Sequence, residues 1–297
     1  MQAVEPRTRT LISDSQLARP RARLLYWTVL WTLIALFALA FLFPLYWMFS
    51  SGFKSASEVL QSPPTLVPHH LDASNYSTAW NSYDLGRFML NTLMYAGGAL
   101  AFQLIFDVSA AYALSKLRPL FGNVVLFLML STLMIPAMVL IIPQYLTALN
   151  LPFVHWDLLN TPWAIWLPSV ANGFNIFLLK RFFDSVPQDL LSAAKIDGAG
   201  PLRTLWSVVL PLSRPILGVV SIFAVVSCWK DFLWPYLVLT DTSKMTINVG
   251  LFSLSGDGIP ENVFMAALAM ACVPTVVFFL VFQRNIMSGL TAGGLRG

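Results

Sequence analysis

Long apolar stretches alternate with shorter polar segments along the whole chain. A helix needs about 20 mostly apolar residues to cross a hydrocarbon core roughly 30 Å thick. Six stretches reach that length, at about 24–49, 91–114, 122–149, 158–182, 215–239 and 262–283. The pattern therefore predicts an all-α membrane protein with six transmembrane helices.

Prolines interrupt the third and fourth of these stretches. They are Pro136, Pro143, Pro162 and Pro168. A proline in a membrane helix frees a backbone carbonyl, which a neighbouring helix or water must satisfy. We expect both spans to be kinked and packed inside a bundle. The outer segments are expected to be irregular around 50–90 and turn-rich around 240–261.

The composition supports a membrane protein. Hydrophobic residues make up 57% of the chain and charged residues 11%, whereas a soluble domain carries about 25% charged residues. The apolar excess must therefore face lipid. The net charge of +4 matters through its position relative to the membrane, and we expect no nucleic-acid partner.

Lysine and arginine set the expected orientation. With the N-terminus inside, 14 of the 18 basic residues fall in inner segments, and only Lys54, Arg87 and Lys244 fall in outer loops. This bias predicts that both termini are cytoplasmic. The expected organisation is a cytoplasmic N-terminal arm (1–23), a six-span domain (24–284) with an inner loop at 183–214, and a cytoplasmic tail (285–297).

Sequence motifs for catalysis or metal binding are absent. Cys228 and Cys272 lie in apolar runs, and the three histidines have no cysteine or carboxylate at a metal-ligand spacing. The chain has no phosphate-binding G-x-x-x-x-G-K-[ST] loop, no G-x-S-x-G and no H-E-x-x-H. We expect no catalytic residue, no metal and no cofactor in this chain.

The inner loop combines basic residues with two short amphipathic segments. Ser185 or Asp184 can cap a helix with Pro187 in its first turn, and Gly198 can end it. A second short helix begins at Pro201, and Pro211 and Pro215 are expected to stop it. Small side chains at Ala193, Ala194, Gly198 and Ala199 favour a protein cleft over lipid, which prefers bulky side chains.

The loop resembles a known motif. Ser192-Ala193-Ala194-Lys195-Ile196-Asp197-Gly198-Ala199, followed after eleven residues by Pro211, is similar to the E-A-A-x-x-D-G-A…L-P loop of ABC importer permeases. Four further segments, 133–136, 142–145, 176–180 and 229–235, look like the sugar-permease branch. The glycine-rich end at 289–297 is similar to the tails of maltose-type permeases.

This resemblance implies a type I ABC importer permease fold in a bacterial inner membrane, with a cytoplasmic coupling helix between spans 4 and 5. It also implies three kinds of partner: a second homologous permease, an ATPase dimer that binds ATP and Mg, and an extracytoplasmic solute-binding protein. The coupling residues would be Ser192, Ala193, Ala194, Asp197, Gly198, Ala199 and Pro211. Ser192 replaces the family's usual Glu, and an exposed ion pair contributes only about 0–1 kcal/mol, so we expect docking to survive.

The candidate substrate path combines charged, amide and aromatic side chains. Charges inside spans are costly and are functional candidates, so Lys230 and Asp231 either line a wet cavity or form a structural pair. A cation at Lys230, where relatives usually carry an amide, favours a polar or anionic substrate. The other candidates are Tyr145, Asn172, Asn175, Trp229 and Trp234. These would contact a sugar, or else serve as interhelical hydrogen bonds and interface aromatics. For Asp107 in the second span, we favour a structural role.

The resulting hypothesis is a carbohydrate importer permease. The alternatives are the same type of transporter for a phosphorylated polyol or another small organic solute, and a membrane-embedded enzyme.

Overall fold

The computed structural model describes residues 19–294, with side chains from 19 to 283. Every regular element among these residues is helical. The elements are α2 (Pro20–Ser51), α3 (Ala56–Val59), α4 (Ser74–Ser82), α5 (Leu85–Tyr112), η1 (Ala113–Leu117), α6 (Gly122–Thr132), α7 (Ala137–Leu149), α8 (Trp163–Ser169), α9 (Gly173–Asp184), α10 (Gln188–Ile196), α11 (Pro201–Thr204), η2 (Leu205–Val209), α12 (Leu210–Leu212), α13 (Arg214–Lys230), α14 (Leu233–Val238), η3 (Thr242–Lys244), α15 (Ile247–Gly256) and α16 (Glu261–Gly294). The all-α prediction is confirmed.

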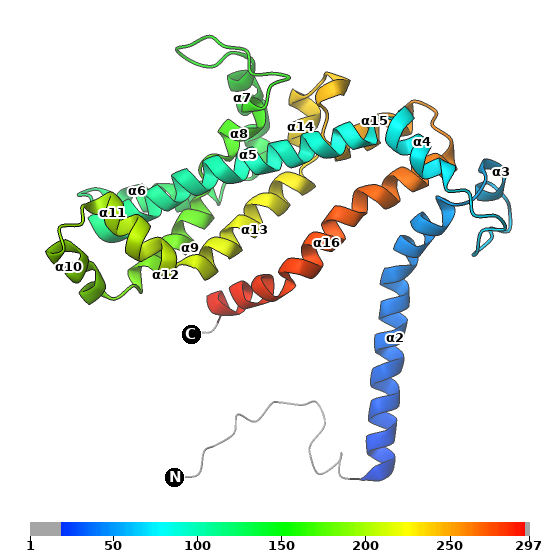
Figure 1. Ribbon diagram of the computed structural model, residues 1–297, viewed down its shortest axis with the longest axis horizontal. Coiled ribbons are helices and arrows are strands. Elements are labelled where there is room, and N and C mark those ends of the chain that lie inside the picture. The colour runs from blue at the N-terminus through cyan, green and yellow to red at the C-terminus, as the bar shows by residue number, and fades with distance from the viewer. Residues whose placement is uncertain (1–18, 295–297) are drawn as a thin grey trace.

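Three helices of the described part are long and apolar enough to cross a membrane as single pieces: Pro20–Ser51, Leu85–Leu117 and Glu261–Gln283. Two bent pairs also qualify: α6 with α7, at 103°, and Pro201–Leu212 with α13, at 85°. Helix α13 packs against both α5 and α16, and α9 packs against α5 and α13 (Figure 1). These helices form the body of the molecule.

The fourth and fifth predicted spans are not single helices. The stretch at 158–182 divides into α8 and α9, and the stretch at 215–239 divides into α13 and α14. Pro168 lies inside α8, two residues before its C-cap Val170, and has no N–H to donate to the turn before it. The second break falls at Asp231, whose φ of −65° and ψ of 129° are extended. Apolar composition alone did not locate that break.

The end of the bundle opposite α10 contains more helix than predicted. The segment at 240–261, expected to be turn-rich, holds α15, of which Ile247 and Leu251 are buried against α5. Helix α15 is ten residues long, too short to span a bilayer. Its apolar residues fill a core instead. The turn residues in this segment therefore gave a wrong prediction of irregular structure.

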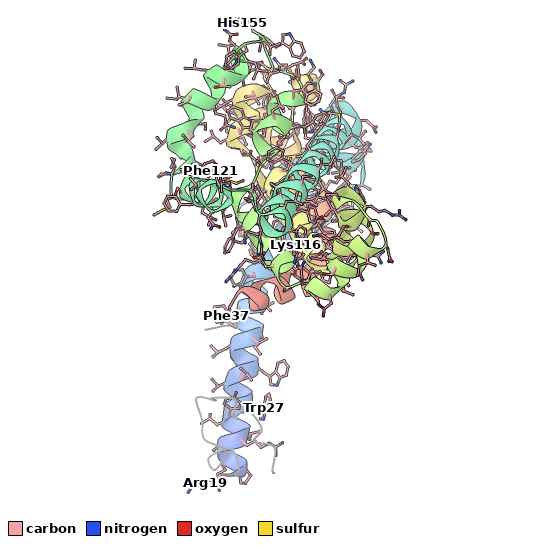
Figure 2. The ribbon with its side chains drawn as sticks, turned by 90° about the vertical axis from the view of Figure 1, so that its left-hand side faces the viewer. Arg19, Trp27, Phe37, Lys116, Phe121 and His155 are labelled. Carbon is pink, nitrogen blue, oxygen red and sulfur yellow. The ribbon has the colours of Figure 1, made fainter. Side chains whose placement is uncertain are left out.

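Helix α2 separates from the body along most of its length (Figure 1). Its apolar side chains, including Trp27, Phe37 and Phe41, are exposed (Figure 2). Near its C-terminal end α2 packs against α16, and Ser50 Oγ donates a hydrogen bond of 2.9 Å to Leu66 O. The exposed length of α2 therefore needs lipid or another apolar partner.

The ends of the chain are described only in part. Most of the predicted N-terminal arm, 1–18, lies outside the described residues. Helix α2 already begins at Pro20, four residues before the predicted span. Helix α16 continues to Gly294, through most of the predicted tail at 285–297, whose side chains lie outside the described part.

Candidate functional site

A cavity of about 810 Å³ opens in the body of the molecule between α5, α7, α8, α9, α13 and α14. Three helix breaks border it: at Pro136 between α6 and α7, at Asn172 between α8 and α9, and at Asp231 between α13 and α14. Irregular backbone at membrane depth is tolerated where it lines a cavity. Broken helices of this kind are typical of substrate sites in transporters.

Side chains replace the backbone hydrogen bonds that the prolines remove. Pro168 has no N–H for the carbonyl of Ala164, and Trp234 Nε1 donates to that carbonyl at 2.9 Å. Pro235 likewise cannot donate to the carbonyl of Asp231, and Asn248 Nδ2 lies 3.4 Å from that oxygen and 2.8 Å from Trp229 O. These contacts hold the broken helices in fixed positions around the cavity.

Lys230 and Asp231 both line the cavity, at the break between α13 and α14. The Asp231 carboxylate faces the backbone N–H groups of Phe232 and Trp234, at the start of α14. Lys230 is exposed, and the ion pairs of the described residues involve Lys180, Lys244 and His69 but not Lys230. The interpretation of Lys230 and Asp231 as a structural pair is therefore unsupported. Among the described lining residues, Lys230 is the one cation.

Asn172 and Asn175 lie at the break between α8 and α9 and line the cavity. The Asn172 side chain accepts a hydrogen bond of 3.1 Å from Asn175 N and so caps α9. Fully buried Asp107 accepts a hydrogen bond of 3.0 Å from Asn172 N. Its other oxygen has no hydrogen-bond partner among the described residues. Asp107, which lies on α5, therefore holds the backbone at this break in place. This agrees with the structural role favoured for it from the sequence.

The predicted aromatic path residues divide into two groups. Trp234 borders the cavity but is only 9% exposed, and its indole N–H donates a hydrogen bond to the carbonyl of Ala164. Tyr145 and Trp229 are not among the lining residues. Tyr145 instead packs on the core cluster that contains Trp234. Trp234 therefore serves as a wall of the cavity.

Four polar lining residues were missed from the sequence: Gln103, Gln144, Ser169 and Ser227. Gln144 and Ser169 stand beside the helix-breaking residues Pro143 and Pro168. The position of a polar side chain beside an intramembrane proline could have identified these two residues from the sequence. Gln103 and Ser227 have no proline beside them. A single polar residue in an apolar helix often makes an interhelical hydrogen bond instead.

The turn of the inner loop at Gly198 forms as predicted, but the predicted N-cap was wrong. Asp184 ends α9, Ser185 is the C-cap of α9, and Pro187 precedes α10 with no side-chain cap. Helix α10 runs over Gln188–Ile196, and Gly198 follows it with φ of +77°, a conformation that glycine adopts without strain. Ser192, Ala193, Asp197 and Gly198 are exposed, whereas Ala194 and Ala199 are half-buried. The small-residue surface is therefore open on this chain.

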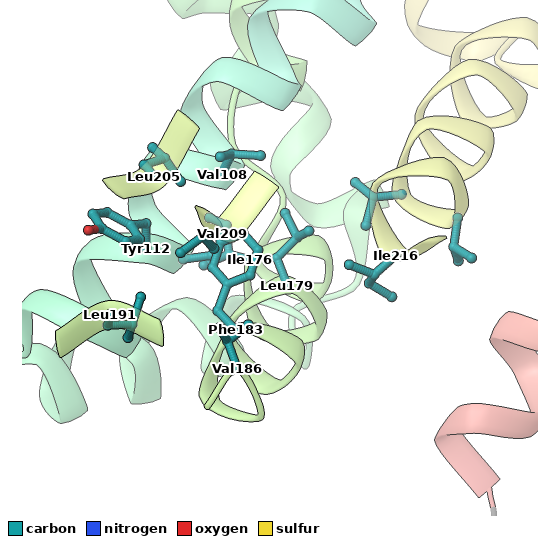
Figure 3. Close-up of a cluster of buried hydrophobic side chains, with 13 residues drawn as sticks. Val108, Tyr112, Ile176, Leu179, Phe183, Val186, Leu191, Leu205, Val209 and Ile216 are labelled. Carbon is teal, nitrogen blue, oxygen red and sulfur yellow. The ribbon is translucent and has the colours of Figure 1, made fainter. Parts of the chain in front are cut away.

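The loop is anchored to the bundle by apolar contacts. Leu191 of α10 and Leu205 and Val209 of η2 are buried in a cluster with side chains of α5, α9 and α13 (Figure 3). Tyr112 Oη also donates a hydrogen bond of 3.1 Å to Pro201 O. Any force applied to α10 therefore reaches α5, α9 and α13 through packed side chains.

The expectation that Pro211 stops the second short helix was wrong. Helical structure continues from Pro201 to Leu212, and Pro211 lies inside α12. The turn before it is the π-helical η2. A π-bulge widens the backbone just where the proline ring would meet the carbonyl of Ser207. The helix ends at Leu212 with Ser213 as its C-cap, and Pro215 is the second residue of α13.

Comparisons with known proteins agree with these features. Residues 104–291 match the family described as binding-protein-dependent transport system inner membrane component. The chain is 31% identical to the diacetylchitobiose uptake system permease protein NgcG of Streptomyces coelicolor, over 89% of this chain and 87% of that protein. It is 34% identical to the sn-glycerol-3-phosphate transport system permease protein UgpE of Yersinia pestis bv. Antiqua, over 85% of this chain and 91% of that protein.

A solved structure has a similar fold. A chain of a bacterial ABC transporter involved in the import of the acidic polysaccharide alginate is 27% identical and superposes with a TM-score of 0.79, over 93% of this chain and 99% of that one. The sequence resemblance is thus confirmed. The chain belongs to the family of binding-protein-dependent transport system inner membrane components, and it is a membrane permease subunit of such a transport system.

Proposed function

We propose that this chain forms half of the translocation path of an ATP-driven carbohydrate importer. The observation that carries the proposal is the cavity with polar side chains on its walls, bordered by three helix breaks. A volume of about 810 Å³ falls in the range of roughly 300–1,000 Å³ typical of small-molecule sites. Sugar hydroxyls would find the amides Asn172, Gln103 and Gln144 on its walls.

Six spans with both termini in the cytoplasm form part of the same proposal. Helices α2, α5 and α16 would cross as single pieces, and the pairs α6–α7, α8–α9 and α13–α14 would cross as broken ones. The bias of basic residues towards the α10 end, which carries Lys180, Arg181, Lys195 and Arg203, supports placing that end inside. A C-terminal reporter fusion active only in the cytoplasm tests this orientation.

The coupling proposal assigns α10 to an ATPase partner that binds ATP and Mg. Its support is the contrast between an open small-residue surface at Ala193 and Gly198 and a buried anchor at Leu191. ATPase closure would move α10, and the packed cluster would carry that motion into α5, α9 and α13. Two further partners belong to this assembly: a solute-binding protein at the opposite end, and a second permease, against which the exposed face of α2 would pack.

The coupling proposal is tested by adding bulk to the open surface. Ala193→Arg should reduce co-purification with the ATPase and abolish ATP-driven uptake, because the long side chain cannot enter a close backbone contact. Ala56→Arg, on an exposed alanine in α3 at the opposite end, is the matched control for assembly and should leave ATPase retention unchanged. Normal ATPase retention and uptake in Ala193→Arg would refute the assignment.

Lys230 favours a second candidate class of substrate, a phosphorylated polyol or an acidic saccharide. Lys230 lines the cavity and makes no ion pair within the part of the chain that the structure describes. Two of the relatives named above serve anionic solutes by name, glycerol phosphate and alginate. A cation in a low-dielectric cavity favours an anion and disfavours a neutral sugar that cannot neutralise it.

Reconstituted transporter distinguishes the two classes. Proteoliposomes holding the whole complex would be supplied with neutral disaccharides, glycerol phosphates and uronate oligosaccharides. If the substrate is anionic, Lys230→Gln should reduce its uptake at least about tenfold, and Lys230→Arg should restore most of it. Unchanged uptake of an anionic substrate in Lys230→Gln would refute the role of Lys230, whereas uptake of neutral sugars alone would leave the neutral carbohydrate as the substrate.

A further inference from the structure

A second cavity, of about 580 Å³, lies where the end of α5 meets the start of α6 and the end of α9. It is separate from the translocation cavity, and the two share no lining residue. Its lining residues are Leu114, Ser115, Arg118, Pro119, Leu120, Gly122, Asn123, Lys180 and Asp184. Because Leu117 ends a helix long enough to cross the membrane, this cavity sits at a membrane–water boundary.

The cavity carries an excess of positive charge. Its single carboxylate, Asp184, accepts hydrogen bonds of 2.6 Å from Ser115 Oγ and 2.8 Å from Lys180 Nζ. Burial raises the pKa of Asp184, but these bonds and the nearby lysine charges outweigh it and lower the pKa. Asp184 is therefore ionised and neutralised by Lys180. The charge of Arg118 is left without an anionic partner among the described residues.

Arg118 is held in place by the backbone. Its Nε donates a hydrogen bond of 3.3 Å to Ser115 O, and its own N–H donates one of 2.9 Å to Ala113 O. The two terminal guanidinium nitrogens have no hydrogen-bond partner among the described residues. The amide of Asn123 lies on the same cavity. A fixed arginine fork beside an amide is suited to a phosphate group.

The rim of this cavity is apolar on the side of the membrane. Leu120 is 92% exposed, and Leu117 and Phe121 are also largely exposed. Phe121 lies between the lining residues Leu120 and Gly122, where the chain passes from η1, which holds Lys116, into α6 (Figure 2). Beyond the rim, the apolar side chains Val124, Phe127 and Leu128 of α6 are exposed as well. An apolar tail anchored at Arg118 would run along this face.

We propose that the cavity at Arg118 binds the phosphate headgroup of an anionic phospholipid whose acyl chains lie along α6. A basic pocket between membrane helices, with an apolar face leading into the hydrocarbon, matches the chemistry of such a lipid. The lipid would belong to the cytoplasmic leaflet in the orientation proposed above. Bound there, it would neutralise Arg118 and fill the gap between α6 and α9, next to the segment that leads into α10.

Native mass spectrometry of the purified transporter complex, exchanged from detergent with phosphatidylglycerol and phosphatidylcholine in equal amounts, tests the proposal. The wild-type complex should retain phosphatidylglycerol preferentially. Arg118→Gln should weaken that retention about fivefold, the effect expected for one basic residue near an anionic surface. Arg118→Lys should keep most of it, because the charge remains.

Two control variants distinguish a lipid site from a general effect of charge. Arg87→Gln removes an exposed arginine at the opposite end of α5 and should change nothing. Leu120→Gln keeps every charge but removes an apolar contact, so it should lower phosphatidylglycerol retention as well. Equal loss in Arg87→Gln would overturn the proposal. So would full displacement of the lipid by millimolar inorganic phosphate, which would mark a free-phosphate site, or capture of a protein with no lipid retained.

Discussion

Trp234 Nε1 donates a 2.9 Å hydrogen bond to the carbonyl of Ala164, the oxygen that Pro168 leaves without its usual donor. The two residues belong to α14 and α8, which are themselves halves of broken helices. One side chain therefore both satisfies a proline-freed carbonyl and joins two walls of the 810 Å³ cavity.

Trp234→Phe should lower the stability of the assembled complex by about 1–2 kcal/mol, because the carbonyl of Ala164 is left buried without a donor. The aromatic bulk is largely retained, so the loss reports the hydrogen bond. The measurement is the thermal unfolding midpoint of the purified complex in detergent.

A double mutant distinguishes this cause from altered packing. Pro168→Ala supplies a backbone N–H that can donate to Ala164 O, as in an ordinary helical turn. In the Pro168→Ala background, Trp234→Phe should therefore cost markedly less. Equal cost in both backgrounds would show that Trp234 acts through packing alone.

The sequence predicted the breaks caused by proline better than those without it. Pro136 and Pro168 mark two of the three breaks around the cavity, and kinks were expected there. At the break at Asp231, the following proline, Pro235, lies four residues later. The sequence was therefore equally compatible with a continuous span. The donor partners Trp234 and Asn248 were not predictable, because they come from distant segments that only tertiary packing brings together.

Gly98 and Gly97 are adjacent on α5 but have opposite surroundings. A Cβ at Gly98 would overlap the indole of Trp166, whereas a Cβ at Gly97 meets nothing within 4 Å. The indole cannot easily move, because Trp166 Nε1 donates a hydrogen bond of 3.1 Å to Tyr95 O and its ring packs edge-on against Trp163. Gly98 thus permits the close approach of α8 to α5.

Gly98→Ala should destabilise the complex by about 1–3 kcal/mol through overpacking and lower substrate uptake, since α8 carries part of the cavity wall. Gly97→Ala is the matched control and should be neutral or stabilising by up to about 1 kcal/mol, the helix propensity difference. Unfolding midpoints and proteoliposome uptake measure both. Similar behaviour of the two variants would contradict the packing role assigned to Gly98.

Gly198 and Gly200 offer a second matched pair, in the inner loop. Both have open space around a built Cβ, but Gly198 has φ of +77° and Gly200 has φ of −70°. Gly198→Val should therefore strain the turn after α10 by at least about 1 kcal/mol and reorient the loop, leaving ATP hydrolysis uncoupled from uptake. Gly200→Val should remain coupled, and the ratio of ATP hydrolysed to solute imported measures the difference. Equal coupling ratios would refute the conformational argument.

The inner loop at 183–214 shows how much of the site could be predicted from the sequence. The turn at Gly198 and the start at Pro201 were predicted, because glycine and proline act locally. The division of its apolar residues was not predicted. Leu205 and Val209 are buried, whereas Leu202 and Trp206 remain exposed. Which of these apolar residues are buried depends on where α5 and α9 pack. The helical repeat of the sequence does not specify that packing.

Glu58 connects stability to pH at the end of the molecule opposite α10. This buried carboxylate accepts hydrogen bonds of 2.8 Å from Thr65 Oγ1 and 3.1 Å from His69 N. Burial raises its pKa, but these bonds and the charges of His69 and Lys54 outweigh it, so the pKa falls below its ordinary value of 4.5. A carboxylate with a lowered folded-state pKa contributes stability above its unfolded pKa and loses it as pH falls through the folded value.

The unfolding midpoint of the complex should therefore drop as pH falls below about 4.5, the ordinary pKa of the carboxyl, and Glu58→Gln should make that drop smaller while lowering the midpoint at pH 7. The amide keeps the shape of the side chain but cannot titrate, so only the proton-linked part disappears. Glu261→Gln, at an exposed glutamate in the first turn of α16, is the control and should retain the wild-type slope. An unchanged slope in Glu58→Gln would mean that other carboxylates set the acid sensitivity of the complex.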